Sequence, residues 1–516
     1  MKKIQIFVLI GLILMFGLLL ETSAQTPKPS RELRIALETL YDETLHPLWG
    51  TMYRKTYFEP LYDFLVGIDE KGDFDPKQSI AYKWSEAPNR LSWTFWIRDG
   101  VKFHNGDPLT LEDVAYSIEE CKSKKNIAGK RSDYEEFLDK VEIVPPDKVV
   151  VHLKKPWFMM LYFLSDRGGS EGCILPKKYI KEKGEKFFLD KPIGTGPYKV
   201  ISRKEGDHIK FEAIDSHWRV GVPKYKYLTF RLIPEEGTRD AALRAGEVDI
   251  IITGIERTKK LKDSGFIIHP KRDSQEGTVR WLWNFKPEFP TNKKKVRQAL
   301  IYAINKQEIV DYILMGQGEV IGHAQNMFRW SIEYKPYPLT PYDPKTAKKL
   351  LAEAGYPNGF TMYFYSFVTA LPEEKRINET IASYWGEIGV NTKVLEMDYS
   401  AFKPVWTKEK EPPGPAAFLG VFASRPVYSW RAAWHSSGLY NHTKDPKLDS
   451  LVDKYESQTN LDEYIKAGQA VMDYTLEDFQ VTGLFSTHTL FASNKDVPIW
   501  NMGKGTASYR FVYIGK

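Results

Sequence analysis

The stretch KPIGTGPYKV, from Lys191 to Val200, decides how this chain is interpreted. Its G-x-G invites comparison with phosphate-binding loops, which require G-x-x-x-x-G-K-[ST], or G-x-G-x-x-G between a strand and a helix. Here Pro197 follows Gly196 directly, and the strand-like run YKVISR comes next. Because proline lacks an N–H donor and glycine permits sharp turns, the pattern predicts a rigid turn into a strand near a domain crossover. Ligand contact by Thr195 stays open.

The surrounding chain alternates between strand and helix signals. Capping patterns start helices at Thr110, Asn305, Asp343 and Asp445. Between them lie runs rich in β-branched and aromatic residues, such as LSWTFWIR, KVVVHLK, YLTFRLI and VRWLWNF. This mixture predicts an α/β architecture. Neither internal repeats nor a long Gly/Ser linker interrupts it, so we expect domains that are closely joined.

Composition restricts the class of protein. The 516 residues suffice for two or three domains, and 42% hydrophobic with 27% charged residues is typical of a globular chain. The formal net charge is +6, but basic residues stand beside acids, as in Lys181-Glu182-Lys183. Nucleic-acid binding requires basic residues gathered on one face, so no nucleic-acid partner is expected.

The N-terminus has the pattern of a secretory signal. Lys2 and Lys3 precede the apolar run Ile6 to Leu20, and Thr22 and Ala24 have the small-residue spacing of a cleavage site. We expect residues 1–24 to be a cleavable signal peptide, with an uncleaved anchor as the alternative, and a periplasmic or extracytoplasmic location. No cysteine follows the apolar run, so no lipid anchor is expected.

The chain has two cysteines, Cys121 and Cys173. In an oxidising compartment they could form a disulfide. Two buried free thiols are the alternative. Neither belongs to a C-x-x-C motif, and we expect no metal site.

Five segments in a fixed order carry a resemblance to a known family. They are IRDGVKFHNGDPLTLEDVAYSI (97–118), IGTGPYKV (193–200), LRAGEVDI (243–250), VRQALIYAINKQEIV (296–310) and YDPKTAKKLLAEAGYPNGF (342–360). The chain resembles the family 5 extracellular solute-binding proteins, receptors of ABC importers for dipeptides, oligopeptides and nickel. Each motif alone is weak, whereas five in order, over nearly the whole chain after residue 24, are specific.

The resemblance implies a two-lobed periplasmic binding protein fold of type II, in the large cluster with an extra subdomain. Lobe I would comprise residues 25–275, with the subdomain at about 65–185, and a return at 485–516. Lobe II would comprise residues 276–484, with the ligand cleft between the lobes. It further implies a monomer without cofactor, which closes on its ligand and delivers it to ABC permease subunits with cytoplasmic ATPases.

Two candidate ligand patches precede residue 300. Met52 and Tyr53 match a segment that reaches the cleft in related receptors. In VRWLWNF, strand alternation places Trp281 and Trp283 on one face and Asn284 on the other. For the tryptophans, packing in the core is the alternative reading.

A third patch extends from Phe422 to Asn441. Peptide-binding relatives carry a pattern like D-x-x-D-P here, but this chain has no acid in the segment. Arg425 and Arg431 could instead bind a carboxylate in bidentate fashion. Tyr428, Trp430 and Trp434 could stack on rings. The pattern favours an anionic, aromatic or sugar-like ligand, or a metal in an anionic chelator; the alternative is that the arginines pair with surface acids.

Other function classes receive less support. The hydrolase motif H-E-x-x-H is absent, and a secreted hydrolase is the less favoured alternative. We therefore expect a binding protein and not an enzyme. An oligosaccharide receptor of the same fold, or a sensory receptor, remains the alternative.

Overall fold

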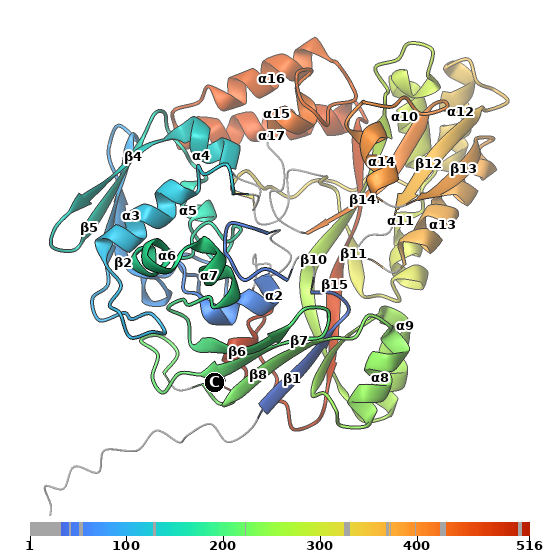
Figure 1. Cartoon of the computed structure of the whole chain (residues 1–516). Coiled ribbons are helices and arrows are strands. Elements are labelled where there is room, and N and C mark those ends of the chain that lie inside the picture. Colours follow the sequence, from blue (N-terminus) through green and yellow to red (C-terminus); the bar gives the residue numbers. More distant parts are fainter. Residues whose placement is uncertain are drawn as a thin grey trace, which may run out of the picture.

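The computed structural model shows two lobes joined by a shared sheet (Figure 1). It describes residues 32–40, 43–50, 55–126, 131–221, 223–324, 331–367, 371, 373–397, 399–423, 430–503 and 508–515. The predicted signal peptide lies outside these residues. No helix among the described ranges is long and apolar enough to cross a membrane.

An 11-stranded mixed sheet runs through the whole molecule. Its central strands, β10 and β15, are antiparallel and unusually long, and they join the strands of one lobe to those of the other. The order is β13 (Asn391–Met397), β12 (Thr361–Phe367), β14 (Ala416–Ala423), β10 (Ile267–Leu282), β15 (Val481–Ser493), β9 (Ile250–Thr253), β1 (Glu32–Leu37), β8 (Tyr227–Leu232), β7 (His208–Ala213) and β6 (Tyr198–Lys204), with β11 (Gly318–Val320) paired to β15.

A separate four-stranded antiparallel sheet forms the subdomain of the first lobe. Its order is β2 (Ala81–Glu86), β3 (Ser92–Ile97), β5 (Lys148–Leu153) and β4 (Leu138–Val144). Alternation along β5 buries Val149, Val151 and Leu153. These side chains belong to the same hydrophobic core as β1 and β8, so the subdomain is not packed independently of its lobe.

Helices flank both sheets and begin where the sequence predicts. Thr110 and Asp113 form a complete capping box, and Asn305, Asp343 and Asp445 each cap a helix through the side chain. First-lobe helices are α2 (Lys55–Phe58), α3 (Leu111–Glu120), α4 (Arg131–Phe137), α5 (Met160–Phe163), α6 (Lys177–Lys183), α7 (Glu185–Asp190), α8 (Glu236–Arg244) and α9 (Ile255–Asp263). Second-lobe helices are α10 (Lys294–Tyr302), α11 (Lys306–Glu308), α12 (Pro344–Glu353), α13 (Glu374–Glu387), α14 (Tyr399–Trp406), α15 (Trp430–Trp434), α16 (Pro446–Glu456) and α17 (Leu461–Glu477).

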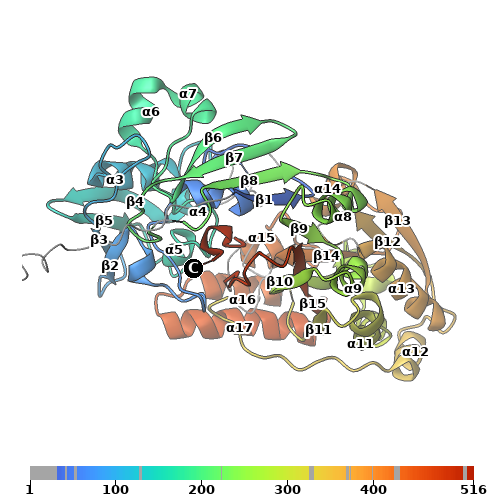
Figure 2. The ribbon, with the colours of Figure 1, turned by 90° about the horizontal axis from the view of Figure 1, so that it is seen from below.

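The second lobe has a core on each face of its part of the sheet. On one face, Val279 and Trp281 of β10 pack with α10 and α13. On the other face, Phe418 of β14 packs with Phe402 and Trp406 of α14. A third cluster lies among α15, α16 and α17. Seen from below, α16 and α17 also lie beside the subdomain of the first lobe (Figure 2).

The predicted lobe limits coincide with the shared strands. The limit after residue 275 falls inside β10, and the limit after residue 484 falls inside β15. With these limits, the chain would pass between the lobes within continuous strands at both places. These two strands are the elements that any movement of one lobe against the other must bend.

Candidate functional site

The GTGP segment is a structural joint and not a phosphate loop. The Gly194 N–H donates to His104 Nδ1 at 3.2 Å, so the ring proton lies on Nε2, which donates to the Gly196 carbonyl at 2.9 Å. Burial lowers the pKa of His104 to about 4, which keeps the ring neutral. Thr195 is 1% exposed and lies inside this joint.

The two glycines are required for a reason that differs from the predicted one. A Cβ at Gly194 would lie 2.0 Å from the Leu61 carbonyl oxygen, and one at Gly196 would lie 2.5 Å from that of Pro60. Neither glycine has a positive φ. They allow close backbone approach to the 59–61 turn, whereas the sequence had suggested turn geometry.

The candidate site is the polar part of β10 and β15, at the place where both strands join the two lobes. We call this part the polar crossing. Polar residues interrupt both strands where the lobes meet, in KRDSQEG (271–277) and STHT (486–489). The strand register shifts here, because residues 272–274 stand opposite His488 alone between the pairs Lys271–Thr489 and Gln275–Thr487. A bulge of this kind bends a sheet locally and is frequent near functional sites.

On the second-lobe side, the crossing holds a buried acid–imidazole pair. Glu276 of β10 is 0% exposed, and its Oε2 lies 2.9 Å from His323 Nε2. The Tyr334 ring packs edge-on against His323. Sequence reasoning missed both members of the pair.

On the first-lobe side, the crossing adjoins a network of buried charges. Lys55 Nζ, at the start of α2, lies 2.6 Å from Asp166 Oδ1. Burial alone would raise the pKa of Asp166, but the Lys55 ammonium brings it below the usual value. Ser508 donates to the Glu59 carboxylate, and its carbonyl accepts from Lys271 of β10. Burial and the nearby Asp166 raise the pKa of Glu59.

The predicted patch before Lys55 cannot be placed, because Met52 and Tyr53 lie outside the described residues. The described chain resumes two residues after Tyr53, at Lys55, within the buried network.

The aromatic run at the end of β10 is divided between two cores. Trp281 is 1% exposed and donates its indole N–H to the Phe479 carbonyl at 2.7 Å. β10 ends at Leu282, and Trp283 has a φ of +53°, so the predicted alternation does not continue. Trp283 donates to the Val405 carbonyl at 3.1 Å, and Asn284, 4% exposed, donates to Gln480 at 2.6 Å.

The third predicted patch is only partly described. Arg425 and Tyr428 lie outside the described residues. Trp430 and Trp434 are buried at 6% and 1% exposure. The Arg280 guanidinium lies 4.1 Å from the Trp434 ring centroid.

Arg431 faces away from the core. It forms ion pairs with Asp453 at 2.5 Å and Glu456 at 2.6 Å, both on α16. This arrangement corresponds to the alternative in which an arginine of this segment pairs with surface acids.

The two cysteines do not form a disulfide in this structure. Cys121 and Cys173 are buried free thiols in this structure, which corresponds to the second alternative considered for them. Within the described ranges, no three His, Cys, Asp or Glu side chains are grouped so that they could hold a metal ion.

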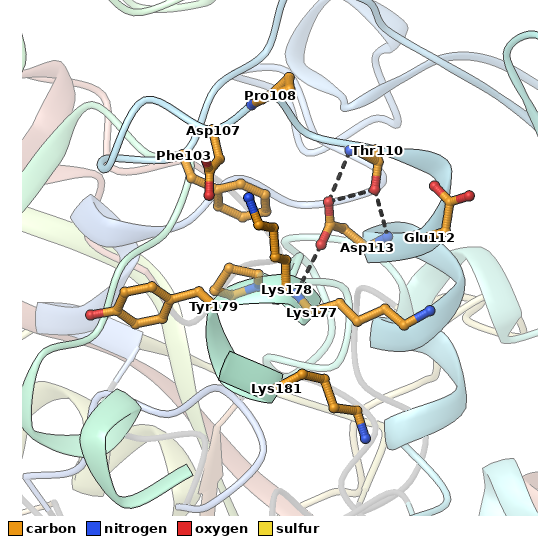
Figure 3. Close-up of a pocket in the computed structure, with 11 residues that line it drawn as sticks. Phe103, Asp107, Pro108, Thr110, Glu112, Asp113, Lys177, Lys178, Tyr179 and Lys181 are labelled. Atoms are coloured by element: carbon orange, nitrogen blue, oxygen red, sulfur yellow. Dashed lines mark hydrogen bonds between the residues drawn. The ribbon is translucent and has the colours of Figure 1, made fainter. Parts of the chain in front are cut away.

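A pocket of about 410 Å³ lies in the subdomain, between the 103–113 segment and the start of α6 (Figure 3). Its buried carboxylate, Asp113, accepts from the Thr110 N–H at 2.9 Å, the Thr110 hydroxyl at 2.7 Å and the Lys177 N–H at 2.8 Å. Lys178 and Lys181 are exposed. Because Asp113 is occupied in joining α3 to α6, we assign this pocket no ligand.

The sequence does carry a signal for the polar crossing. Central strands of a sheet are normally apolar, so polar runs inside β10 and β15 mark a place where the sheet meets something other than a core. The partners Lys55, Asp166 and Ser508 come from distant segments, and their association follows only from the fold.

Comparisons with known proteins identify the group to which the chain is similar. The profile described as "Bacterial extracellular solute-binding proteins, family 5 Middle" matches residues 75–441. Heme-binding protein A of Haemophilus influenzae is 30% identical over 383 residues, covering 69% of this chain and 68% of that protein. Oligopeptide-binding protein AppA of Bacillus subtilis is 28% identical over 496 residues, covering 89% and 87%.

A glutathione-binding protein, GsiB of Pectobacterium atrosepticum, is 28% identical over 346 residues, and the match covers 65% of its length. Among solved structures, HbpA2 of Haemophilus parasuis superposes with a TM-score of 0.72 at 25% identity, over 91% of this chain and 96% of that one. AppA of Bacillus subtilis, in complex with a nonapeptide, gives 0.71 at 24% identity, over 94% and 99%. The fold is therefore that of the periplasmic binding proteins.

Proposed function

The chain belongs to the bacterial extracellular solute-binding proteins of family 5, and from this membership we propose that it is the substrate-binding component of an ABC importer. It captures a small solute, peptide-like or anionic or a metal chelate, between its lobes and delivers it to a membrane permease. An oligosaccharide is the alternative ligand class. Members of the family are binding proteins, and we propose that this chain likewise has no catalytic activity.

One observation carries the proposal: the lobes are joined through two paired strands, and the register of this pairing shifts at the polar crossing. A ligand that touches both lobes favours the closed state by population shift. The polar crossing, with Lys271 and Glu276, provides buried charge from both lobes at that place. From the sequence alone, we further propose Met52, Tyr53, Arg425 and Tyr428 as ligand contacts.

The lobe limits, the location and the partners are part of the same proposal. We assign residues 25–275 and 485–516 to lobe I and residues 276–484 to lobe II. Residues 1–24 act as a cleaved signal peptide, so the exported monomer begins at Gln25. Mass spectrometry of the exported protein and light scattering test these assignments; a mass that includes residues 1–24, or a stable dimer, contradicts them.

The ligand is tested by a thermal-shift screen of residues 25–516. The compounds are dipeptides and oligopeptides, glutathione, heme, oligosaccharides, organic acids and nickel chelates. A specific ligand raises the melting temperature because it binds only the folded state, by about 2.7 kcal/mol of stability at 100 times its Kd. No shift with any class would contradict the proposed function in its present form.

Separate arginine variants decide the ligand's charge. If an anion is bound through Arg425, Arg425→Ala abolishes the shift. Arg431→Ala leaves it intact, since Arg431 is engaged with Asp453 and Glu456. An unmodified dipeptide that shifts wild type and Arg425→Ala equally would contradict the anionic assignment.

A further inference from the structure

Two aromatic rings from different lobes are in contact. Phe158 follows β5 in the subdomain, and Tyr464 lies in the first turn of α17. Their ring centroids are 4.5 Å apart, with 43° between the ring planes. Figures 1 and 2 both show α17 beside the subdomain. The two residues belong to different lobes, so they separate whenever the lobes move apart.

The first ring is held firmly by its own lobe. Trp157, the residue before Phe158, is 4% exposed and packs against Tyr134 and Phe137 at centroid distances of 4.9 and 5.3 Å. The Arg90 guanidinium lies 5.0 Å from the Phe158 ring centroid. Phe158 thus follows a buried, well-packed residue and has the Arg90 guanidinium over its ring, although its own ring is only half-buried.

The second ring is held by a buried polar chain. The Tyr464 hydroxyl is hydrogen-bonded to that of Tyr455, which donates to Glu333 Oε1 at 2.7 Å. Glu333 is 3% exposed and also packs against Gly468, one turn further along α17. Packing inside each lobe therefore fixes the position of each ring before the two rings come into contact. Such preorganisation lets the same contact form each time the lobes close.

We propose that Phe158 and Tyr464 form a latch that favours the closed arrangement of the lobes without touching the solute. An aromatic pair of this geometry shifts a two-state equilibrium roughly 2- to 12-fold. A protein that is already partly closed binds its ligand more tightly, because a larger fraction is competent to bind. This consequence for binding rests on the proposed function, whereas the latch itself does not.

A second contact between the lobes provides a natural control. Arg376 of α13 forms an ion pair with Glu256 of α9, and the two side chains are 50% and 66% exposed. Solvent-exposed ion pairs contribute little because water and salt screen them. We therefore assign the latch function to the rings and not to this pair.

The test is a double electron–electron resonance measurement on ligand-free protein. Spin labels are attached at Glu135→Cys and Lys466→Cys, on exposed positions of α4 and α17. The native Cys121 and Cys173 are buried at 0% and 2% exposure and do not compete for the label. Phe158→Ala should reduce the ratio of short to long distances roughly 2- to 12-fold.

Three further variants make the result specific. Phe187→Ala removes a partly exposed ring of α7, elsewhere in the first lobe, and Arg376→Gln removes the exposed ion pair; both should leave the distances unchanged. Tyr464→Leu should reproduce the effect from the other lobe, which also covers the case that Phe158→Ala fails to fold. Unchanged distances in Phe158→Ala or Tyr464→Leu, or a single long distance in wild type, would overturn the latch. The measurement uses no ligand, so failure of the ligand screen leaves it interpretable.

Discussion

Lys306 is a buried ammonium group held by two hydroxyls. It is 6% exposed, and its Nζ donates to Thr482 Oγ1 at 2.7 Å and to Thr340 Oγ1. Burial lowers its pKa from 10.5 to about 7. Between pH 7 and pH 10.5 the unfolded chain binds a proton at this position that the native chain does not. The contribution of Lys306 to stability therefore increases as the pH rises through this window.

Lys306→Met should remove this dependence of stability on pH. At pH 7 we expect the variant to be more stable than wild type by roughly 1 to 3 kcal/mol, since replacing a poorly compensated buried charge by an apolar group is neutral or stabilising. Urea unfolding at pH 7, 8 and 9 measures the difference between the two proteins. Lys262→Met, which changes an exposed lysine, should show the same pH dependence of stability as wild type. A difference between Lys306→Met and wild type that does not change with pH would refute the assignment.

The burial of residues such as Lys306 could not be predicted from the sequence, for a physical reason. The cap at Asn305, next to Lys306, was predicted correctly because capping depends on neighbours three residues apart. Burial of the lysine depends on Thr340 and Thr482, which the fold brings from far along the chain. The same holds for Trp430 and Trp434, where composition alone does not separate a core ring from a ligand-stacking ring.

At the scale of elements, the joint between the 193–197 turn and the 59–61 turn is sensitive to a single methyl group. A Cβ at Gly196 would lie 2.5 Å from the Pro60 carbonyl oxygen and 2.6 Å from the Leu61 carbonyl carbon. Both contacts are backbone atoms that cannot rotate away. Gly196→Ala should therefore lower the free energy of unfolding by roughly 1 to 3 kcal/mol.

Gly386→Ala is the matched control for this change. Gly386 lies in α13, and nothing lies within 4 Å of the added Cβ. Alanine is favoured over glycine inside a helix, so this variant should be as stable as wild type or up to about 1 kcal/mol more stable. Chemical denaturation compares the two. Equal stabilities for the two variants would show that the joint tolerates the methyl group.

Local patterns predicted elements well where the determining contacts are local. The caps at Thr110, Asp343 and Asp445 are confirmed. The alternation expected through Trp283 was wrong, since the strand ends one residue earlier and the backbone enters the left-handed region. A strand's end depends on its partners, and β14 begins opposite Leu282.

At the scale of the molecule, the ordered set of motifs predicted the fold, because each motif is a local joint that sequence shows directly. The candidate site was harder to predict. Lys55, Asp166, Lys271 and Ser508 meet only because β10 passes between the lobes and the C-terminal segment returns to the first one. Sequence proximity carries no information about such encounters, although the polar runs within the two central strands marked the place.

At the polar crossing, the interrupted β10–β15 ladder should leave backbone amides weakly protected. Closure of the lobes has to bend β10 and β15, and the ladder is already interrupted where residues 272–274 face His488. Amides in 272–274 should therefore exchange with deuterium faster than those in 278–280, which pair without interruption with β14 on one side and β15 on the other. Hydrogen-exchange mass spectrometry of the ligand-free protein, with overlapping peptides across β10, measures this difference. Residues 418–421 of β14, paired with β10 throughout, serve as the internal reference. A ligand found in the thermal-shift screen should slow exchange in 272–274 more than in the reference, because closure fixes the bend. Uniform protection along β10 would contradict a hinge at the polar crossing.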